Sequence, residues 1–427
     1  MRRAKAGLPI NTTTMRRVAI TGLGVVSPVG IGCDAFFAAL LAARSGLRAL
    51  DMAFPHGVES VIAGSIDFDP DAHFARAKLI TMDRVSQLAL VAAREAMAQA
   101  GLGDMAVREG LPPERFGVCV GTGSGGSGST EAAYTALLEQ KVTRLRPLTV
   151  VLAMNNAIAA QVTMEFGLKG PSSTLSNACA SSANAIGDAF RQIRHGYADA
   201  MLVGGSEALL NRGSIRAWQA MHTLAKPHAD GAHASCRPFS QDRTGLVLSE
   251  GAAMLVLEDW DTAHRRGANI LAELAGYAST TDAHHLTQPQ AAGQAAAMAL
   301  GLRDASLNAG DIAYLNAHGT ATDVGDVVET NAIRLAFQAA AATLPVSSTK
   351  ALHGHAMGAA GAIEFIASVM ALRTGQLPPT AFLETPDTRC DLDYIPLQAR
   401  ECQGMRAVMS NSFAFGGSNA VLIAKSV

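Results

Sequence analysis

The stretches TLSNACASSANAIGDAF (174–190) and VSSTKALHGHAMGAAGAIEF (346–365) share one order of features. Each begins with a short strand-like run, continues through an elbow of small residues and ends in an alanine-rich helical pattern. Each also lies in the middle to later part of its half of the chain. We interpret the pair as a weak internal repeat, which predicts two similar α/β halves whose elbows face one site.

The charged segment EDWDTAHRRGAN, near residue 265, is the predicted boundary between the halves. We expect an N-terminal half over 15–265 and a C-terminal half over 266–427. Residues 1–14 are expected to be an extension that is disordered or precedes the native start at Met15. They carry basic residues but no apolar run, so they fit neither a signal peptide nor a membrane anchor.

The rest of the chain alternates short β-branched runs, which end in glycine, serine or threonine, with long alanine- and leucine-rich patterns. This alternation predicts the α/β class. Helices are expected over 34–44, 82–100, 152–166, 181–195, 290–304, 324–338 and 356–374.

Composition excludes several classes of function. The chain has 427 residues, of which 49% are hydrophobic and 16% charged, and this balance is typical of a globular protein rather than a disordered one. A net charge of −2 gives no basic field for nucleic acid. The longest apolar candidate, 356–372, contains glycines and Glu364, so no membrane span is expected. Six cysteines without a CxxC spacing indicate a reducing cytoplasm rather than a disulfide scaffold or a zinc ribbon.

Two motifs could bind a cofactor or a metal ion. Gly121, Gly123 and Gly126 form a GxGxxG pattern after a predicted strand, but no second strand ending in an acidic residue follows about 20 residues later, as dinucleotide binding requires. The loop is better interpreted as glycines packed at an interface. The histidine pairs 353/355 and 284/285 have no acidic residue in a familiar ligand spacing, so a metal site is the weaker hypothesis.

Cys179 is the strongest nucleophile candidate. It follows a strand and precedes a helix, where the positive end of the helix dipole is expected to lower the pKa of the thiol. A free cysteine is more often a buried small hydrophobe. His318 and His355 alter that balance, because both occupy small-residue elbows in the opposite half of the chain, where strands deliver catalytic groups.

These residues carry a family resemblance. The chain is similar to the β-ketoacyl-acyl-carrier-protein synthases of the elongating type. The matching stretches are RRVAITGLGVVSPVG, NACASS, RPFSQDRTG, GAAMLVLED, NAHGTATDVGD, STKALHGHAMGAAGAIE and NSFAFGGSNAVLI. The resemblance covers nearly everything after Met15. It implies the thiolase fold, in which two βαβαβαββ halves form five α-β-α-β-α layers, usually in a dimer.

The resemblance also implies the chemistry. Cys179 matches the acyl-accepting nucleophile, and the backbone amides of Cys179 and Phe415 would hold the oxyanion. His318 and His355 match the two neutral imidazoles that donate to the enolate formed when malonyl loses carbon dioxide. Histidine at both positions places the chain with the elongating enzymes, since the initiating type has asparagine at one of them.

The remaining residues implied by the resemblance support or line the site. Lys350 and Glu364 match a charge pair behind the histidines, and Lys350 is expected to assist catalysis. Thr320 and Thr322 match hydroxyls along the malonyl and phosphopantetheine channel. Glu364, Thr320, Thr322 and Phe413 are therefore predicted substrate-binding residues.

Several positions depart from the family pattern. Ala414 replaces a glycine and should stiffen the loop that moves the gating residue Phe415. Thr149 replaces an aromatic residue beside the acyl pocket at the dimer boundary, and Val120 stands where an aliphatic side chain sets pocket depth; both are predicted to bind substrate. His222 stands at a position of a carrier-binding arginine. The expected carrier patch then consists of Arg76, Lys141, Arg144 and Arg146.

The sequence predicts a cytoplasmic ketosynthase that acts on acyl chains held by an acyl carrier protein. We expect no resident cofactor, because 4′-phosphopantetheine arrives on the carrier. One alternative is a non-catalytic chain-length factor, which would lack Cys179. Another is a thiolase acting on coenzyme A esters, which would need a second cysteine near the C-terminus. Fatty acid, polyketide and aryl polyene pathways stay open, as do a homodimer and a heterodimer with a related ketosynthase or chain-length factor.

Overall fold

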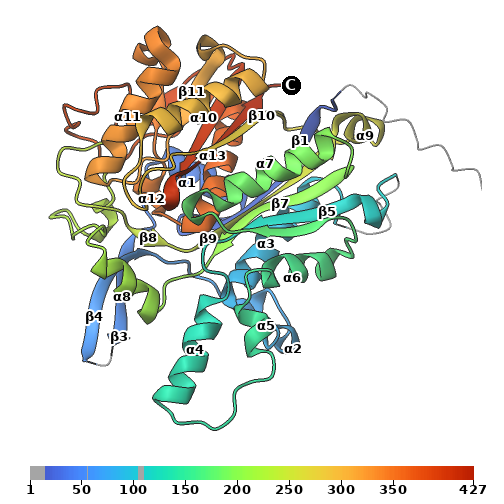
Figure 1. The fold of residues 1–427 in the computed structure, drawn as a ribbon, viewed down its shortest axis with the longest axis vertical. Helices are drawn as coiled ribbons and strands as arrows, with labels where there is room; N and C mark the ends of the chain where they lie inside the picture. Colours follow the sequence, from blue (N-terminus) through green and yellow to red (C-terminus); the bar gives the residue numbers. More distant parts are fainter. Residues whose placement is uncertain (1–14, 55, 104–109) are drawn as a thin grey trace, which may run out of the picture.

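The computed structural model describes residues 15–54, 56–103 and 110–427, so the predicted extension over 1–14 lies outside the described residues. Within these residues, 11 strands form one large sheet (Figure 1). The N-terminal half contributes β1 (Val18–Ser27), β5 (Phe116–Gly121), β6 (Ser172–Leu175), β7 (Ala200–Glu207) and β9 (Gly251–Asp259), with the short β2 (Gly30–Ile31) beside β1. The C-terminal half contributes β10 (Ala272–Thr281), β11 (Ile312–Asn316), β12 (Val346–Ser347), β15 (Ala407–Phe413) and β16 (Ser418–Lys425).

The two sets of strands repeat one topology. The order is β6-β5-β7-β9-β1 in the first set and β12-β11-β15-β16-β10 in the second. In each set the first three strands run parallel and the last two pairings are antiparallel. The sets meet where β1 pairs antiparallel with β10, from Val18 opposite Leu274 to Ile20 opposite Ala272. The expectation of two similar halves is therefore confirmed.

The helices complete a five-layered α-β-α-β-α arrangement, in which each of the two sets of strands is one β layer. Helices α7 (Ser181–Arg194) and α13 (Ala360–Thr374) form the inner layer, and their apolar residues share one core with strands of both halves. Helices α3 (Arg84–Gln99) and α6 (Ala157–Phe166) cover the outer face of the first set of strands. Helices α10 (Ala291–Asp304) and α11 (Asp323–Phe337) cover the second set. This is the predicted thiolase-like fold.

Helix α13 is buried on every side. Each residue from Ala360 to Leu372 is buried. The helical run Met357–Thr374 is long and apolar enough to cross a membrane by length and composition, but 89% of it is buried inside the protein. A helix that is apolar all round belongs either in a membrane or in a protein core. The apolar composition of α13 is accounted for by the core.

The structure differs from the predicted elements around the outer face of the N-terminal half. The single helix expected over 152–166 is two helices, α5 (Thr149–Ala153) and α6, because extended backbone at Met154 interrupts the pattern. Helix α4 (Ser127–Leu138) projects with α5 from the body of the molecule (Figure 1). Strands β3 (Arg48–Phe54), β4 (Gly57–Gly64) and β8 (Leu248–Ser249) form a separate small sheet. The remaining elements are α1 (Cys33–Leu41), α2 (Arg76–Leu79), α8 (Arg212–Ala220), α9 (Trp260–Arg265), α12 (Lys350–His353), β13 (Gln376–Leu377) and β14 (Arg400–Glu401).

Candidate active site

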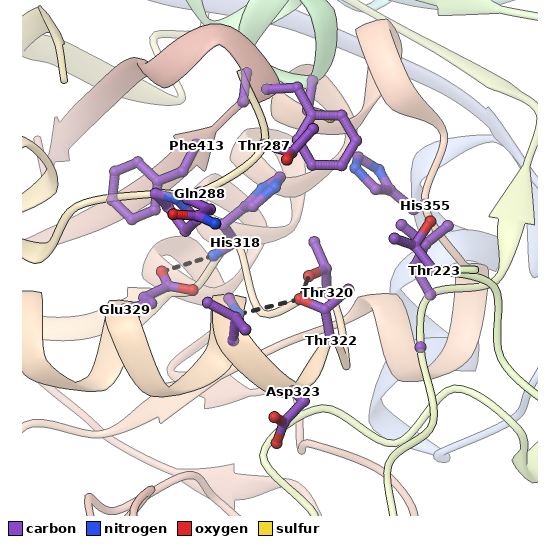
Figure 2. A pocket seen from close by; sticks show the side chains of 18 of the residues that line it. Thr223, Thr287, Gln288, His318, Thr320, Thr322, Asp323, Glu329, His355 and Phe413 are labelled. Atoms are coloured by element: carbon purple, nitrogen blue, oxygen red, sulfur yellow. Dashed lines mark hydrogen bonds between the residues drawn. The ribbon is translucent and has the colours of Figure 1, made fainter. Parts of the chain in front are cut away.

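Three predicted site residues meet in one cavity. Cys179 lies in the tight turn between β6 and α7, His318 follows β11, and His355 follows α12. The Cys179 sulfur and one ring nitrogen of each histidine all lie within 4.8 Å of one another. All three side chains are buried, yet they line a cavity of about 420 Å³. Figure 2 shows the rings of His318 and His355 facing this cavity.

Hydrogen bonds set the tautomers of both histidines. The Met357 amide donates to Nδ1 of His355 at 3.2 Å, and the Lys350 ammonium lies 3.4 Å from Nδ1 of His318. Burial and the positive charge of Lys350 hold the pKa of each imidazole well below its usual value. Each ring is therefore neutral, and its single proton is on Nε2. The site presents two hydrogen-bond donors without a formal charge.

Lys350 and Glu364 form an ion pair with fully buried side chains. Lys350 also donates to the backbone oxygen of His318 at 2.5 Å. Burial raises the pKa of Glu364 to about 7, and Lys350 acts against that rise. Neither side chain lines the cavity. The predicted substrate-binding role of Glu364 is therefore corrected: it pairs with Lys350, and Lys350 positions His318 from behind.

The environment of Cys179 differs from the prediction in one respect. Burial raises the pKa of the thiol to about 12, while the charge of Lys350 and the backbone amides of Phe415 and Cys179 act in the opposite direction. The expected lowering of the thiol pKa at a helix N-terminus is wrong, because Cys179 precedes α7 in a separate 3-10 turn and is buried there. Both amides are nevertheless directed at the sulfur.

The Phe415 amide depends on a tight turn between β15 and β16. Gly416 and Gly417 have φ values of 82° and 77°, which favour glycine. The Gly416 amide donates to the Leu286 oxygen at 2.8 Å. Ala414 has a φ of −127°, an extended conformation open to any residue. Its methyl group therefore fits without backbone strain.

The other predicted substrate-binding residues divide into two groups. Phe413, Thr320 and Thr322 line the cavity, and the two threonine hydroxyls lie 3.0 Å apart (Figure 2). Val120 does not line it, because its side chain packs with the outer core against α3 and α6. Thr149 lies at the start of α5, in a shallow pocket between α4 and α5, also outside this cavity.

The glycine loop after β5 binds a carboxylate of the protein itself. The amides of Gly123, Ser124 and Gly358 donate to the buried Glu207 carboxylate at 2.7, 3.0 and 2.9 Å. Sequence reasoning missed Glu207, and the only signal was an acidic residue at the end of a strand. The amides that a phosphate would need are already used, so the dinucleotide hypothesis fails on geometry.

Only one member of each histidine pair lines the cavity, His355 in one pair and His285 in the other. His353 is buried outside the cavity lining, and its Nε2 lies 3.0 Å from the Thr349 hydroxyl. Cys179, His318 and His355 are close enough to hold a metal ion. A histidine that binds a metal through one nitrogen normally donates from the other. Because Nδ1 of His355 accepts a hydrogen bond, the ring suits hydrogen-bond donation from Nε2 better than metal binding.

None of the four residues of the predicted carrier patch lines the cavity. Arg76 lies on α2, and the other three lie on the connection between α4 and α5; all four are exposed. His222, by contrast, is exposed and lines the cavity. A carrier patch at this entrance would include His222 rather than those four residues.

This combination of fold and site defines a class of enzyme. A thiolase-like fold brings a buried cysteine, two amides directed at its sulfur and two neutral histidines to one cavity. Such a site can accept an acyl group on sulfur and can stabilise negative charge on oxygen without a charged donor. It is the site of an acyl-transferring, carbon–carbon-bond-forming enzyme.

Comparison with known proteins identifies the family. Models described as "Beta-ketoacyl synthase, N-terminal domain" and "Beta-ketoacyl synthase, C-terminal domain" match residues 15–263 and 271–384. Nodulation protein E of Rhizobium meliloti (strain 1021) is 45% identical over 96% of this chain and 100% of its own length. The 3-oxoacyl-[acyl-carrier-protein] synthase 2 of Staphylococcus aureus (strain COL) is 38% identical over 96% and 98%.

A solved structure agrees with these relatives. It holds a type II PKS acyl-carrier protein in complex with its ketosynthase bound to the hexaketide; it has a TM-score of 0.88 and 31% identity, and it covers 97% of this chain and 100% of that one. The chain belongs to the β-ketoacyl synthase family. It is an acyltransferase that condenses an enzyme-bound acyl group with malonyl-acyl-carrier protein and releases CO2.

Proposed function

We propose that Cys179, His318 and His355 divide this reaction into acyl transfer and condensation. The observation that carries the proposal is the meeting of the three reactive atoms within 4.8 Å, with both imidazoles neutral and Nε2 protonated. Phe413, Thr320 and Thr322 line the approach to these atoms.

In acyl transfer, the Cys179 sulfur attacks the thioester carbonyl on the carrier. The carbon–sulfur bond to phosphopantetheine breaks, and the thiol proton passes to the departing sulfur. The amides of Cys179 and Phe415 hold the tetrahedral oxyanion. The same two amides and the charge of Lys350 favour the thiolate, against a burial that raises the pKa of the thiol to about 12.

In condensation, malonyl loses CO2 and negative charge develops on its thioester oxygen. His318 and His355 donate to that oxygen from Nε2, where a neutral imidazole stabilises the enolate without giving up its proton. The enolate carbon attacks the acyl carbon on Cys179, and the sulfur leaves. Lys350 acts through His318, because it contacts both Nδ1 and the backbone oxygen of that residue.

Mass spectrometry and a decarboxylation assay test this division of roles. Incubation with acyl carrier protein that bears an acyl group should add the mass of that group to the peptide containing Cys179 and to no other cysteine peptide. Cys179→Gln should abolish acyl transfer but retain malonyl decarboxylation, whereas His318→Ala and His355→Ala should lose condensation by roughly two orders of magnitude. Labelling of Cys119 or Cys236, or equal loss of decarboxylation in all three variants, contradicts the proposal.

The proposed partners are the acyl carrier protein and a second ketosynthase-like chain. The second chain would cover the apolar outer face of α4 and α5, where Tyr134, Leu138, Val150, Val151 and Met154 are each more than half exposed. Thr149 lies on the same face, so it could approach an acyl chain only in the assembled dimer. Native mass spectrometry distinguishes a homodimer from a heterodimer with a chain-length factor.

The proposed chemistry uses no resident cofactor, since the phosphopantetheine arm comes with the carrier. Its place of action is proposed to be the cytoplasm. All six cysteines are free thiols, which supports a reducing compartment.

A further inference from the structure

Trp218 and Phe415 form an aromatic contact in the wall of the cavity. Their ring centroids lie 5.9 Å apart with an angle of 22° between the planes. Both residues line the cavity that holds Cys179, and both are partly buried. Trp218 belongs to the N-terminal half and Phe415 to the C-terminal half. The stack therefore joins the two halves beside the reactive sulfur.

Helix α8, which carries Trp218, is firmly anchored. The Asn211 side chain caps the helix by accepting from the Ser214 amide at 3.0 Å. Arg212 forms an ion pair with Glu131 of α4. Arg216 lies over the Phe54 ring of β3 at 3.9 Å. Arg212 and Arg216 lie one turn apart on the same face of the helix, so these contacts tie that face to α4 and β3 and support the Trp218 ring.

The partner ring has a weaker support of its own. Phe415 begins a turn whose next two residues are glycines with positive φ, and Gly416 is exposed. A backbone with two glycines in sequence has many accessible conformations. Hydrogen bonds from the Gly416 amide to the Leu286 oxygen and from the Gly417 amide to the Ala414 oxygen hold the rest of the turn. The contacts of the Phe415 side chain then limit how far the Phe415 amide, which is directed at the Cys179 sulfur, can move.

We propose that Trp218 is a positioning residue that holds Phe415 so that its backbone amide faces the Cys179 sulfur. By stacking on the Phe415 ring from a fixed helix, Trp218 reduces the motion of the turn while an acyl group is transferred. This inference deepens the proposed function, because it rests on the role of the Phe415 amide in stabilising the oxyanion.

The proposal predicts which step depends on Trp218. The Phe415 amide serves the tetrahedral intermediate on Cys179, whereas malonyl decarboxylation relies on His318 and His355. Trp218→Ala should therefore slow acyl transfer to Cys179 by about 10- to 100-fold. This loss does not exceed the loss of rate expected when one oxyanion donor is removed completely. Trp218→Phe retains an aromatic face and should recover most of that rate. In a Cys179→Gln background, Trp218→Ala should leave malonyl decarboxylation within about twofold.

The sequence offers a second, independent measurement. The chain has two tryptophans, and Trp260 lies on α9 with the Arg17 guanidinium 3.6 Å from its ring centroid. Trp260→Phe leaves Trp218 as the only indole fluorophore and serves as the matched control for activity. In that variant, loading of an acyl group on Cys179 should change the Trp218 emission, and Gly416→Ala should alter the emission of the unloaded enzyme.

The two measurements have clear outcomes. If the wild-type enzyme loads Cys179 and Trp218→Ala transfers the acyl group at the same rate, the inference is overturned but the proposed function is not. Failure of the wild-type enzyme to load Cys179 overturns the proposed function instead. Equal losses of acyl transfer and decarboxylation in Trp218→Ala show a general packing role and also overturn the inference. If Trp218→Ala does not fold, the fluorescence of Trp260→Phe decides. The inference is overturned if neither acyl loading nor Gly416→Ala changes the Trp218 emission.

Discussion

Replacing Lys350 by methionine removes one charge from a pair that has no access to solvent. The Lys350 and Glu364 side chains are both 0% exposed. Loss of one partner of a buried ion pair leaves the other charge uncompensated and costs about 3–5 kcal/mol. Glu364→Met should have a similar cost. Their combination should cost clearly less than the sum, because neither charge is then left alone.

The matched comparison is an exposed pair on the same protein. Arg334 of α11 and Asp391 are each about half exposed and form an ion pair at the surface. Exposed pairs contribute about 0–1 kcal/mol. Urea unfolding followed by circular dichroism measures both pairs. The expected coupling is at least about 2 kcal/mol for the buried pair and below about 1 kcal/mol for the exposed pair.

The double substitution of Lys350 and Glu364 should change the pH profile of malonyl decarboxylation. The charge of Lys350 helps to hold the pKa of His318 and of His355 well below 6.5. The wild-type rate should therefore stay level as the pH falls from 8 to 6, since both donors remain neutral. The double variant lacks this charge, so its rate should begin to fall at a higher pH. Two results together would refute this reasoning. The stability costs of Lys350→Met and Glu364→Met would add up to that of the double variant within about 0.5 kcal/mol, and the pH profile of decarboxylation would be unchanged.

Two further changes test the turn that carries Phe415 and the buried carboxylate of Glu207. Gly416→Ala and Gly404→Ala each add a methyl group at a positive φ with no neighbour within 4 Å, so each should cost about 1–2 kcal/mol of stability. Only Gly416→Ala should slow acyl transfer, because only Gly416 adjoins Phe415. Equal activity of the two variants would contradict this. Burial raises the pKa of Glu207 from 4.5 to about 7, so the stability contributed by its bound proton is complete below about pH 4.5 and is lost as the pH rises through 7. The unfolding free energy of wild type minus that of Glu207→Gln should therefore fall as the pH rises from 5 to 8, since glutamine stays neutral throughout. A value that rises over this range would count against the reasoning.

The sequence predicted the features that are local in the chain. Cys179 and His318 each stand in an elbow directly after a strand, and His355 stands in an elbow before a helix. Parallel strands deliver such elbows to one edge of a sheet. The repeat of strand, elbow and helix likewise predicted the two halves. These predictions needed only the spacing of apolar, small and reactive residues along a short segment.

The features that the sequence did not yield depend on contacts between distant segments. Glu207 binds Gly358, which lies 151 positions further along the chain. The stack of Trp218 on Phe415 joins two halves that no local pattern brings into register. Val120 occupies a strand that is buried on both faces, and alternation cannot tell which face a given side chain takes there. The thiol pKa of Cys179 is likewise set by burial, which a motif does not display.

The internal repeat explains why a cysteine from one half meets a histidine from the other. The Cys179 elbow precedes α7 and the His355 elbow precedes α13, and these two helices are the neighbouring members of the inner layer. Because the helices are equivalent by the repeat, their N-terminal elbows meet at one place between the sets of strands. Lys350 and Glu364 have no access to solvent there and neutralise each other, and burial keeps both histidines neutral. The fold thus brings the reactive groups together and imposes the protonation states that the condensation needs.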